Sequence, residues 1–244
     1  MDRAHYEVWK SRELSEKYLT GVRGAIPLAR EQIEIMLRVI DACSINIDRI
    51  LDLGCGDGIL AASILRNHPT ASAVLIDISE PMIQAARKQL SAYRDNVEFI
   101  LFDYGDKAWI RKVQAAAPFS AIVSGFSIHH QPDERKKELY SEIFQLLAPK
   151  GLFLNLEHVS SPTDWLSSLF NECFVDKLCQ MHQQNGVTMS REQVAQEFYR
   201  RDDKAANILA PAETQCEWLR AIGFQDVDCY FKMFELALFG GRKP

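Results

Sequence analysis

The sequence predicts an α/β protein built on a mostly parallel sheet, and three observations lead to this fold class. Short apolar segments alternate with helical segments from residue 47 to residue 159, a pattern typical of parallel strands joined by right-handed crossovers. The first apolar segment, RILDLG (49–54), runs into a glycine-rich turn. The last two apolar runs, VDCYFK (227–232) and FELALFG (234–240), nearly touch, which forces an antiparallel pair at the sheet edge.

The remaining elements follow in chain order. Apolar residues in EQIEIMLRVI (31–40) recur at i, i+3, i+4 and i+7, which indicates one buried helical stripe. Besides the two final runs, strands are expected at 49–54, 72–78, 97–103, 119–125 and 152–159. Helices are expected at 59–67, 81–90, 133–149 and 212–222. Ser79 and Asp133 are the expected N-caps of the second and third of these helices.

The pattern divides the chain into two parts. Residues 1–47 are predicted to form an N-terminal helical lid, and residues 48–244 a single ligand-binding domain. A helical insertion at about 162–206 interrupts the domain after its fifth strand. In the insertion, one broad apolar face is expected to include Trp165, Phe170 and Phe174.

Composition excludes several classes of protein. The chain has 244 residues, of which 47% are hydrophobic, enough for one well-packed domain. Its six cysteines are scattered without any C-x-x-C, so neither a disulfide framework nor a zinc ribbon is indicated. The formal net charge is −5, and RKK at 135–137 stands isolated as a basic cluster. We therefore expect no extensive nucleic-acid surface.

The sequence also points away from the membrane. No apolar run approaches the roughly 18–20 residues needed to span a bilayer. The first residues, MDRAHYEVWKSREL, are mixed and charged, without the apolar core of a signal peptide. The expected location is the cytoplasm.

The motif with the clearest chemistry follows the first strand. Its residues are Asp52-Leu-Gly54-Cys55-Gly56-Asp-Gly58. Glycines at such a turn let the backbone approach a ligand, and the next helix presents free N–H groups. A nicotinamide dinucleotide site would place its last glycine at position 59, which is Ile59. The observed spacing instead resembles motif I of class I S-adenosylmethionine (SAM)-dependent methyltransferases.

Three later strand ends extend this resemblance. Asp77 stands where the family holds the ribose hydroxyls, Asp103-Tyr104 where it contacts adenine, and Ser124-Gly125-Phe126 beside the methionine moiety. Ligands of open α/β sheets bind at these carboxyl ends. The resemblance implies a Rossmann-like fold of seven strands, with SAM as cofactor and S-adenosylhomocysteine (SAH) as product. The implied cofactor site is Asp52, Gly54, Cys55, Gly56, Gly58, Asp77, Ile78, Met82, Asp103, Tyr104, Ser124, Gly125 and Phe126.

Within that family, the layout is similar to carboxy-SAM synthase across nearly the whole chain. Shared segments are VRGAIP, LDLGCGDG, LIDISEPMI, QPDERKKELY and LFNECFVDKLCQMHQQNG. In the synthase an arginine of the insertion binds the carboxylate of carboxy-SAM, and Arg201 falls near that position beside Arg200. Gly56, Gly58 and a histidine pair depart from the synthase pattern and match ordinary methyltransferases instead.

Candidate bases follow the fourth and fifth strands. His129 and His130 lie on the loop after strand four, and Glu157 and His158 end strand five. Because successive strand residues face opposite sides, at most one of the latter two is expected in the cleft. His129, His130 and Glu157 are the predicted catalytic residues. The alternative is that the histidines cap the helix near Asp133 or that Glu157 pairs with a lysine. A metal site is not predicted, since no H-x-x-x-H, H-E-x-x-H or carboxylate triad is present.

Aromatic residues of the lid and insertion suggest an acceptor pocket. The predicted substrate-binding residues are Tyr18, Phe170, Phe174 and Arg201. Further aromatic candidates are Tyr6, Trp9 and Trp165. The competing interpretation is that these rings pack the lid onto the domain, with Arg201 as a solvated charge.

The function predicted from these features is methyl transfer from SAM to a small-molecule acceptor. One alternative is a carboxy-SAM synthase-like activity linked to tRNA wobble-uridine modification. Another is a non-catalytic SAM-binding module. The sequence leaves open whether N, O, C or S is methylated. A homodimer is possible through the apolar insertion.

Overall fold

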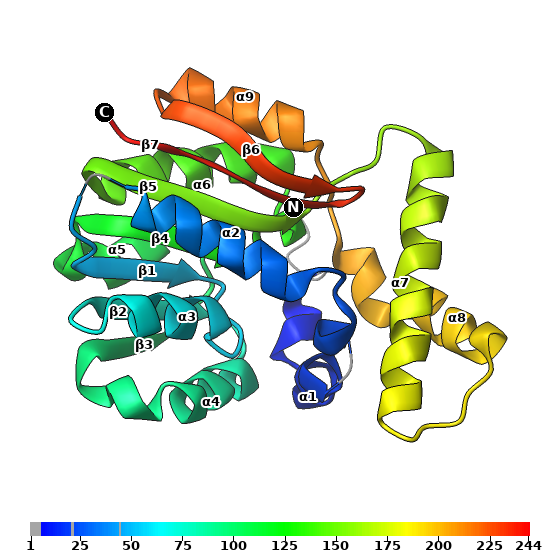
Figure 1. The fold of residues 1–244 in the computed structure, drawn as a ribbon. Coiled ribbons are helices and arrows are strands. Elements are labelled where there is room, and N and C mark those ends of the chain that lie inside the picture. The colour runs from blue at the N-terminus through cyan, green and yellow to red at the C-terminus, as the bar shows by residue number, and fades with distance from the viewer. Residues whose placement is uncertain (1–5, 21, 44) are drawn as a thin grey trace.

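The computed structural model describes residues 6–20, 22–43 and 45–244. They form one seven-stranded sheet in the order β3-β2-β1-β4-β5-β7-β6 (Figure 1). The strands are β1 (Arg49–Leu53), β2 (Ser72–Asp77), β3 (Val97–Leu101), β4 (Phe119–Gly125), β5 (Leu147–His158), β6 (Gln225–Met233) and β7 (Leu236–Arg242). The first five pair in parallel, and β7 pairs antiparallel with both β5 and β6. The predicted fold class is confirmed.

Helices cover both faces of the sheet. One face carries α2 (Ala29–Asp41), α3 (Ile59–Asn67) and α4 (Glu80–Gln89), and the other carries α5 (Trp109–Val113), α6 (Asp133–Leu146) and α9 (Ala212–Ile222) (Figure 1). Two large apolar clusters fill the layers between sheet and helices, as the crossover rule requires. Short 3₁₀ turns occupy Ser91–Asn96 (η3), Gln114–Ala116 (η4) and Ile128–His130 (η5).

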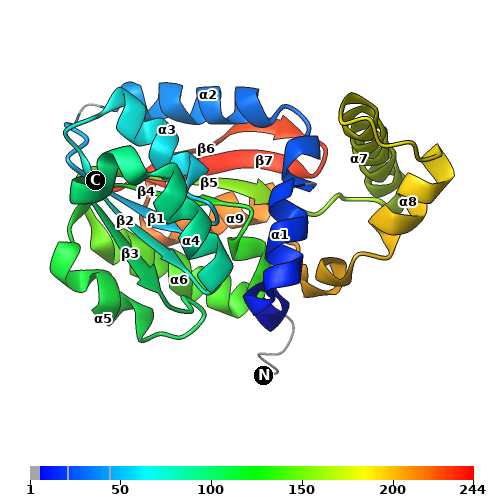
Figure 2. The same cartoon turned by 90° about the horizontal axis from the view of Figure 1, so that it is seen from below.

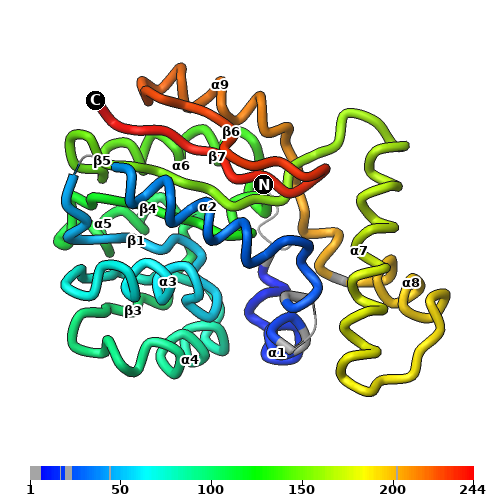
Figure 3. The backbone as a smooth tube through the Cα atoms, in the orientation of Figure 1, coloured from blue at the N-terminus to red at the C-terminus, as the bar shows by residue number. Residues whose placement is uncertain are grey.

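A third group of helices lies beyond the carboxyl ends of the parallel strands. It comprises η1 (Tyr6–Lys10), α1 (Arg12–Thr20), η2 (Val22–Ala25), α7 (Asp164–Gln184), α8 (Arg191–Tyr199) and η6 (Asp202–Ala206). Figure 2 shows α1 crossing this edge, with α7 and α8 farther out. A small third apolar cluster joins the group, because Ala25 shares it with Phe170 and Phe174. The tube in Figure 3 makes the chain crossing from β5 into α7 easy to follow.

The structure corrects several expected boundaries. Helix α2 packs Met36 and Ile40 into the main core, so it belongs to the sheet domain, and the predicted lid narrows to the residues before it. Helix α6 ends at Leu146 instead of continuing to residue 149, and β5 begins at the next residue. Its N-cap is Pro132, and Asp133 is its first residue. Short helices α5 and η4 were not predicted, since each spans at most five residues.

One expectation about a side chain fails, and the predicted N-cap position of Ser79 is confirmed without the capping hydrogen bond. Trp165 does not join the apolar face of α7: it is 69% exposed. Ser79 is the N-cap residue of α4, but its side chain makes no capping hydrogen bond; its Oγ instead lies 3.0 Å from Ser15 Oγ of α1. Within the described part of the chain, every helix is too short or too polar to span a bilayer.

Candidate active site

Two adjoining cavities open at the carboxyl edge of the sheet. The first, called cavity A here, has a volume of about 300 Å³ and lies over the ends of β1, β2 and β4. The second, cavity B, has a volume of about 320 Å³ and lies among η5, α7 and η6. Residues that line both cavities are Trp9, Tyr18, Ile26, Phe126 and His130. The two spaces therefore share one wall.

The glycine turn after β1 gives cavity A its floor. Gly54 has φ +68°, and a Cβ there would lie 1.9 Å from Ser127 Oγ, so only glycine fits. Gly56 has φ +54°, and a Cβ there would meet no atom within 4 Å. The space beside Gly56 is thus free for a ligand that approaches the backbone.

Two buried carboxylates face this floor. Asp77 Oδ2 accepts a hydrogen bond from Gly56 N at 2.8 Å, and its Oδ1 accepts one from Ser79 N at 2.8 Å. Asp52 Oδ2 accepts one from Ala61 N at 3.1 Å, whereas its Oδ1 is buried with no partner among the described residues. Burial raises the pKa of Asp52 to about 8 and also raises the pKa of Asp77. Both groups line the cavity and favour a ligand that brings hydrogen-bond donors or positive charge.

The rest of the cavity wall comes from later strand ends. Asp103 Oδ1 accepts from Gly105 N at 2.7 Å, and the Tyr104 hydroxyl lies 2.6 Å from Ser127 Oγ. Phe126 has φ +50°, an uncommon conformation for a bulky residue. Eleven of the thirteen residues assigned to the cofactor line cavity A, namely Asp52, Gly54, Cys55, Gly56, Asp77, Ile78, Met82, Asp103, Tyr104, Gly125 and Phe126.

Two predicted cofactor residues lie behind the wall instead. Ser124 is fully buried, and its Oγ donates to Leu53 O at 2.7 Å, which ties β4 to β1. Gly58 lines neither cavity; a Cβ there would come within 2.9 Å of Leu90 Cδ1. Both residues therefore support the packing of the domain.

The sequence analysis missed other residues of cavity A. These include Ala29, Arg30, Gln32 and Ile33 from the start of α2, and Ser127 and Gln131 from the loop after β4. The last two flank the predicted residues and were within reach of the motif argument. The α2 residues carried no signal, because only the packing of α2 on the sheet brings them to the strand ends.

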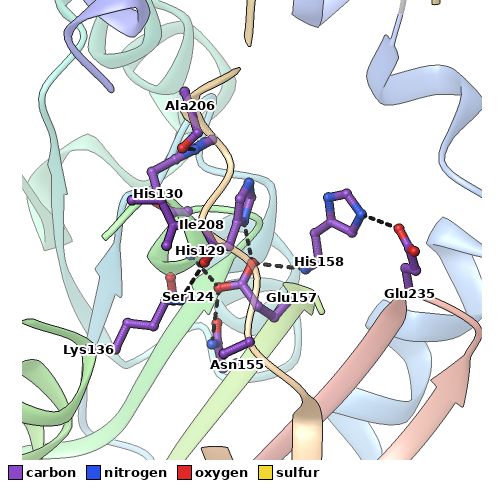
Figure 4. Close-up of polar contacts among 12 residues, drawn as sticks. Ser124, His129, His130, Lys136, Asn155, Glu157, His158, Ala206, Ile208 and Glu235 are labelled. Atoms are coloured by element: carbon purple, nitrogen blue, oxygen red, sulfur yellow. Dashed lines mark hydrogen bonds and ion pairs between the residues drawn. The ribbon is translucent and has the colours of Figure 1, made fainter. Parts of the chain in front are cut away.

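A histidine–carboxylate pair adjoins cavity B (Figure 4). His129 Nδ1 lies 2.5 Å from Glu157 Oε1, and His129 N donates to Glu157 Oε2 at 3.0 Å. Glu157 also accepts from Asn155 Nδ2 at 3.2 Å and from His158 N at 2.9 Å. In its ionised form Glu157 only accepts hydrogen bonds, so His129 Nδ1 then carries the proton and Nε2 is left as an acceptor.

Burial shifts both groups of this pair. It raises the pKa of Glu157 to about 7, against the hydrogen bonds from His158 and Asn155. It lowers the pKa of His129 well below its ordinary value, assisted by the charges of His158 and Lys136. The imidazole is therefore neutral near pH 7, the state in which it can accept a proton.

The neighbouring His130 is held differently. Its Nδ1 lies 3.1 Å from the carbonyl oxygen of Ala206, so this nitrogen carries the proton and donates. Its ring packs against His129 and Trp9, at centroid distances of 4.0 and 5.5 Å. Burial, assisted by the charge of His129, lowers the pKa of His130 to about 3. The two histidines both line cavity B but have different hydrogen-bond partners.

Strand alternation separates the two candidates at the end of β5. Glu157 points into the protein and lines neither cavity, while His158 lines cavity B. His158 Nε2 lies 2.9 Å from Glu235 Oε2 of the β6–β7 turn. The structure therefore places the carboxylate of Glu157, a predicted catalytic residue, outside both cavities and in contact with the His129 ring that lines cavity B.

The four predicted substrate-binding residues, Tyr18, Phe170, Phe174 and Arg201, all line cavity B. Arg201 is not a solvated charge, since its Nε donates to Asp203 Oδ1 at 3.0 Å and its Nη2 to Asp203 Oδ2. Trp9 lines both cavities, Arg200 and Trp165 are exposed, and the Tyr6 side chain lies outside the described residues. Neither histidine caps α6, which has no side-chain capping bond.

Comparison with known proteins agrees with this geometry. Residues 50–151 match a family model described as a methyltransferase domain. Along 88% of this chain and 86% of the relative, the sequence is 23% identical to a carboxy-S-adenosyl-L-methionine synthase of Nautilia profundicola.

Solved structures show the same fold. An O-methyltransferase family protein from Burkholderia thailandensis superposes with a TM-score of 0.62 at 18% identity over 95% of this chain. Human N-acetylserotonin methyltransferase in complex with SAM gives a TM-score of 0.55 at 16% identity over 99% of this chain. This chain spans 59% of the length of each of these two structures.

The family uses SAM, and the residues of cavity A fit it. The unpartnered Asp52 Oδ1 suits the ammonium group of the methionine moiety, and Asp77 suits the ribose hydroxyls. Ile78 and Met82 provide apolar surface for the adenine. Residues 50–151 thus match a methyltransferase domain with the fold of the SAM-dependent enzymes above, and the chain that carries them is similar over most of its length to carboxy-S-adenosyl-L-methionine synthases.

Proposed function

We propose that this chain transfers a methyl group from SAM in cavity A to an O–H or N–H group of a small molecule in cavity B. The observation that carries the proposal is the His129–Glu157 pair, at 2.5 Å, with its ring on cavity B. Phe126 and His130 line both cavities, so the reacting groups would meet at this shared wall.

Bound SAM supplies a methyl group on a positively charged sulfur, which a nucleophile displaces in line. The protein has to place the acceptor and take its proton. Glu157 accepts from His129 Nδ1 and holds the ring, so Nε2 is the nitrogen that would take the proton of the acceptor. Asn207, another residue of cavity B, makes a side-chain hydrogen bond to this ring, and the acceptor would replace this contact at Nε2.

The lid takes part in the proposed mechanism by covering both sites. Trp9, Tyr18 and Ile26 each contribute to both cavities. Ser15 Oγ of α1 lies 3.0 Å from Ser79 Oγ, two residues after Asp77, and this contact is buried. We propose that η1 and α1 open to admit SAM and close to exclude water from the reaction.

The test is an assay of SAH release with a panel of phenols, alcohols and amines. We expect release with at least one acceptor and a loss of about 100-fold or more in turnover for His129→Ala. SAM affinity should change little, because His129 lines cavity B alone. His68→Ala is the matched control, since His68 pairs with Asp41 outside both cavities. Normal turnover in both His129→Ala and His130→Ala would show that the histidine pair is structural.

A second candidate is a carboxy-SAM synthase-like activity, favoured by the similarity to such synthases and by Arg201 in cavity B. The bidentate contact of Arg201 with Asp203 uses Nε and Nη2, so a ligand carboxylate would have to bind through the remaining N–H groups of Nη1 and Nη2. Mass spectrometry of ligand retained through purification separates the two functions. Carboxy-SAM, which is heavier than SAM, would support the synthase, and SAM or SAH would support methyl transfer.

A further inference from the structure

Cavity B contains a cation, Lys204, that forms no ion pair with any side chain that the structure describes. Lys204 of η6 lines the cavity and is half-buried. Among the side chains that the structure describes, none places a carboxylate within ion-pair distance of Lys204 Nζ. The ammonium group instead lies over two rings, 3.9 Å from the centroid of Phe198 and 4.8 Å from that of Tyr199.

The two acidic groups whose charges act on Lys204 are Glu235 and Asp203, and both already accept hydrogen bonds from other side chains. Both oxygens of Asp203 accept from Arg201. Glu235 Oε2 binds His158 Nε2 at 2.9 Å, and side-chain hydrogen bonds from Ser161 and Ser167 also reach this carboxylate. Burial lowers the pKa of Lys204, and the charge of Arg201 lowers it further. A half-buried ammonium is costly without a counter-charge, so an anionic group of a ligand would relieve this cost.

The rings beside Lys204 describe the rest of the ligand. Phe198 stacks on Phe174 at a centroid distance of 5.3 Å, and Phe174 contacts Phe170 at 5.9 Å. The row continues from Phe170 to His158 at 5.6 Å and from His158 to His129 at 5.7 Å. A continuous row of aromatic rings therefore runs from Lys204 to His129, the proposed base. Such surfaces suit a flat ring, which packs by offset or edge contacts.

We propose that the acceptor is a small aromatic acid, with its carboxylate on Lys204, its ring against Phe170 and Phe174, and its protic group at His129. The inference rests on the proposed function, which supplies cavity B as the acceptor site. The volume of about 320 Å³ lies within the range of small-molecule cavities and has room for a substituted aromatic ring.

The experiment is calorimetric titration of the SAH-saturated protein with hydroxybenzoates and hydroxyphenylacetates, each beside its primary amide. We expect the best acid to bind about 10-fold or more tightly than its amide, because a hydrogen bond to a charged partner outweighs a neutral one. Lys204→Met should abolish this preference, and Lys204→Arg should retain it. Lys177→Met is the control, since Lys177 is an exposed residue of α7 outside the cavity.

Three results would overturn the inference: no acid of the panel binds, acids and amides bind alike, or the preference survives in Lys204→Met. The SAH release assay keeps the two proposals apart. Lysine-dependent binding of acids without any SAH release would defeat the proposed methyl transfer and leave the acid site standing. SAH release from neutral acceptors at the same rate in Lys204→Met as in the wild type would support methyl transfer and defeat the acid site.

Discussion

Cavities A and B share a wall, yet the chain builds them in different ways. Cavity A is formed largely by the ends of β1, β2 and β4, where backbone conformation decides the shape, as at Gly54 and Gly56. Cavity B is formed largely by side chains from η5, the insertion and the β6–β7 turn. Under the proposed function, cofactor binding resides at the strand ends of the sheet, and acceptor choice resides in the segments attached to it. Variants in the two cavities should therefore affect different measurements.

The largest expected effect comes from Glu157→Gln. Glu157 holds the ring of His129, which lines cavity B. The carboxylate accepts four hydrogen bonds, and an amide of the same shape must turn its NH₂ toward at least one of these donors. His129 would lose the partner that fixes its tautomer. We expect turnover to fall by about 100-fold or more, while calorimetry shows SAM affinity within about twofold.

A pH profile distinguishes a role in proton transfer from a purely structural one. If Glu157→Gln lowers turnover by the same factor at every pH, then the carboxylate only supports the loop. If the wild type loses activity as Glu157 takes up a proton near its pKa of about 7 and the variant does not, then its charge acts on His129. Unchanged turnover in the variant would contradict the comparison outright.

The next effect comes from Asp77→Ala in cavity A. Losing charge-assisted hydrogen bonds to the ribose should weaken SAM binding by about 1–3 kcal/mol, which corresponds to about 10- to 100-fold in affinity. Calorimetry with SAM measures this directly. Asp95→Ala is the matched control, because the Asp95 side chain is 92% exposed. Full SAM affinity in Asp77→Ala would remove Asp77 from the cofactor site.

A smaller effect concerns how the free energy of unfolding depends on pH. Its expected source is the buried carboxyl group of Asp52 in cavity A. Burial raises the pKa of Asp52 to about 8, so between about pH 5 and 8 the folded chain holds a proton that the unfolded chain has lost. Stability must then fall as pH rises, by at most about 1.4 kcal/mol per pH unit for this group. Asp52→Asn should flatten the slope in urea unfolding of the ligand-free protein. An identical slope in the variant would exclude Asp52 as its source.

The smallest effect is expected where the lid contacts cavity A. Ser15→Ala removes the buried contact with Ser79 Oγ and should cost about 1 kcal/mol. We expect a few-fold weaker SAM affinity, since the lid covers the cofactor less tightly. Ser141→Ala is the control, because Ser141 Oγ donates to Lys137 O on the exposed side of α6. Equal affinities for the two variants would mean that α1 does not act as a lid.

The comparison also explains how far sequence reasoning reached. Cavity A was predictable because parallel strands place their carboxyl ends together, so Asp52, Asp77 and Asp103 converge by topology alone. Two residues predicted for the cofactor site, Ser124 and Gly58, do not line cavity A. The Ser124 side chain points to β1, and Gly58 packs closely against Leu90. A motif identifies the turn but not the direction of every side chain in it.

For cavity B, the sequence predicted several residues that line the cavity. It did not predict which side chains contact one another there. Tyr18, Phe170, Phe174 and Arg201 were placed there because the lid and the insertion must lie over the strand ends. The contact of Arg201 with Asp203, two residues away, and that of His158 with Glu235, across β5 and the β6–β7 turn, depend on side-chain rotamers. The sequence offered no reason to select Lys204. Its importance rests on the absence of an ion pair with the side chains that the structure describes, and a sequence pattern does not reveal this.

The sequence by itself determined the order of strands and helices, the glycine turn and the four strand ends that form a cofactor site. These follow from hydrophobic period and local backbone chemistry, which short segments carry. Only the tertiary structure decided that α2 packs on the sheet, that Glu157 contacts His129, and that Lys204 lines cavity B beside a row of aromatic rings. Those outcomes depend on contacts between residues far apart in the chain, and local patterns do not encode which distant side chain will meet a given group.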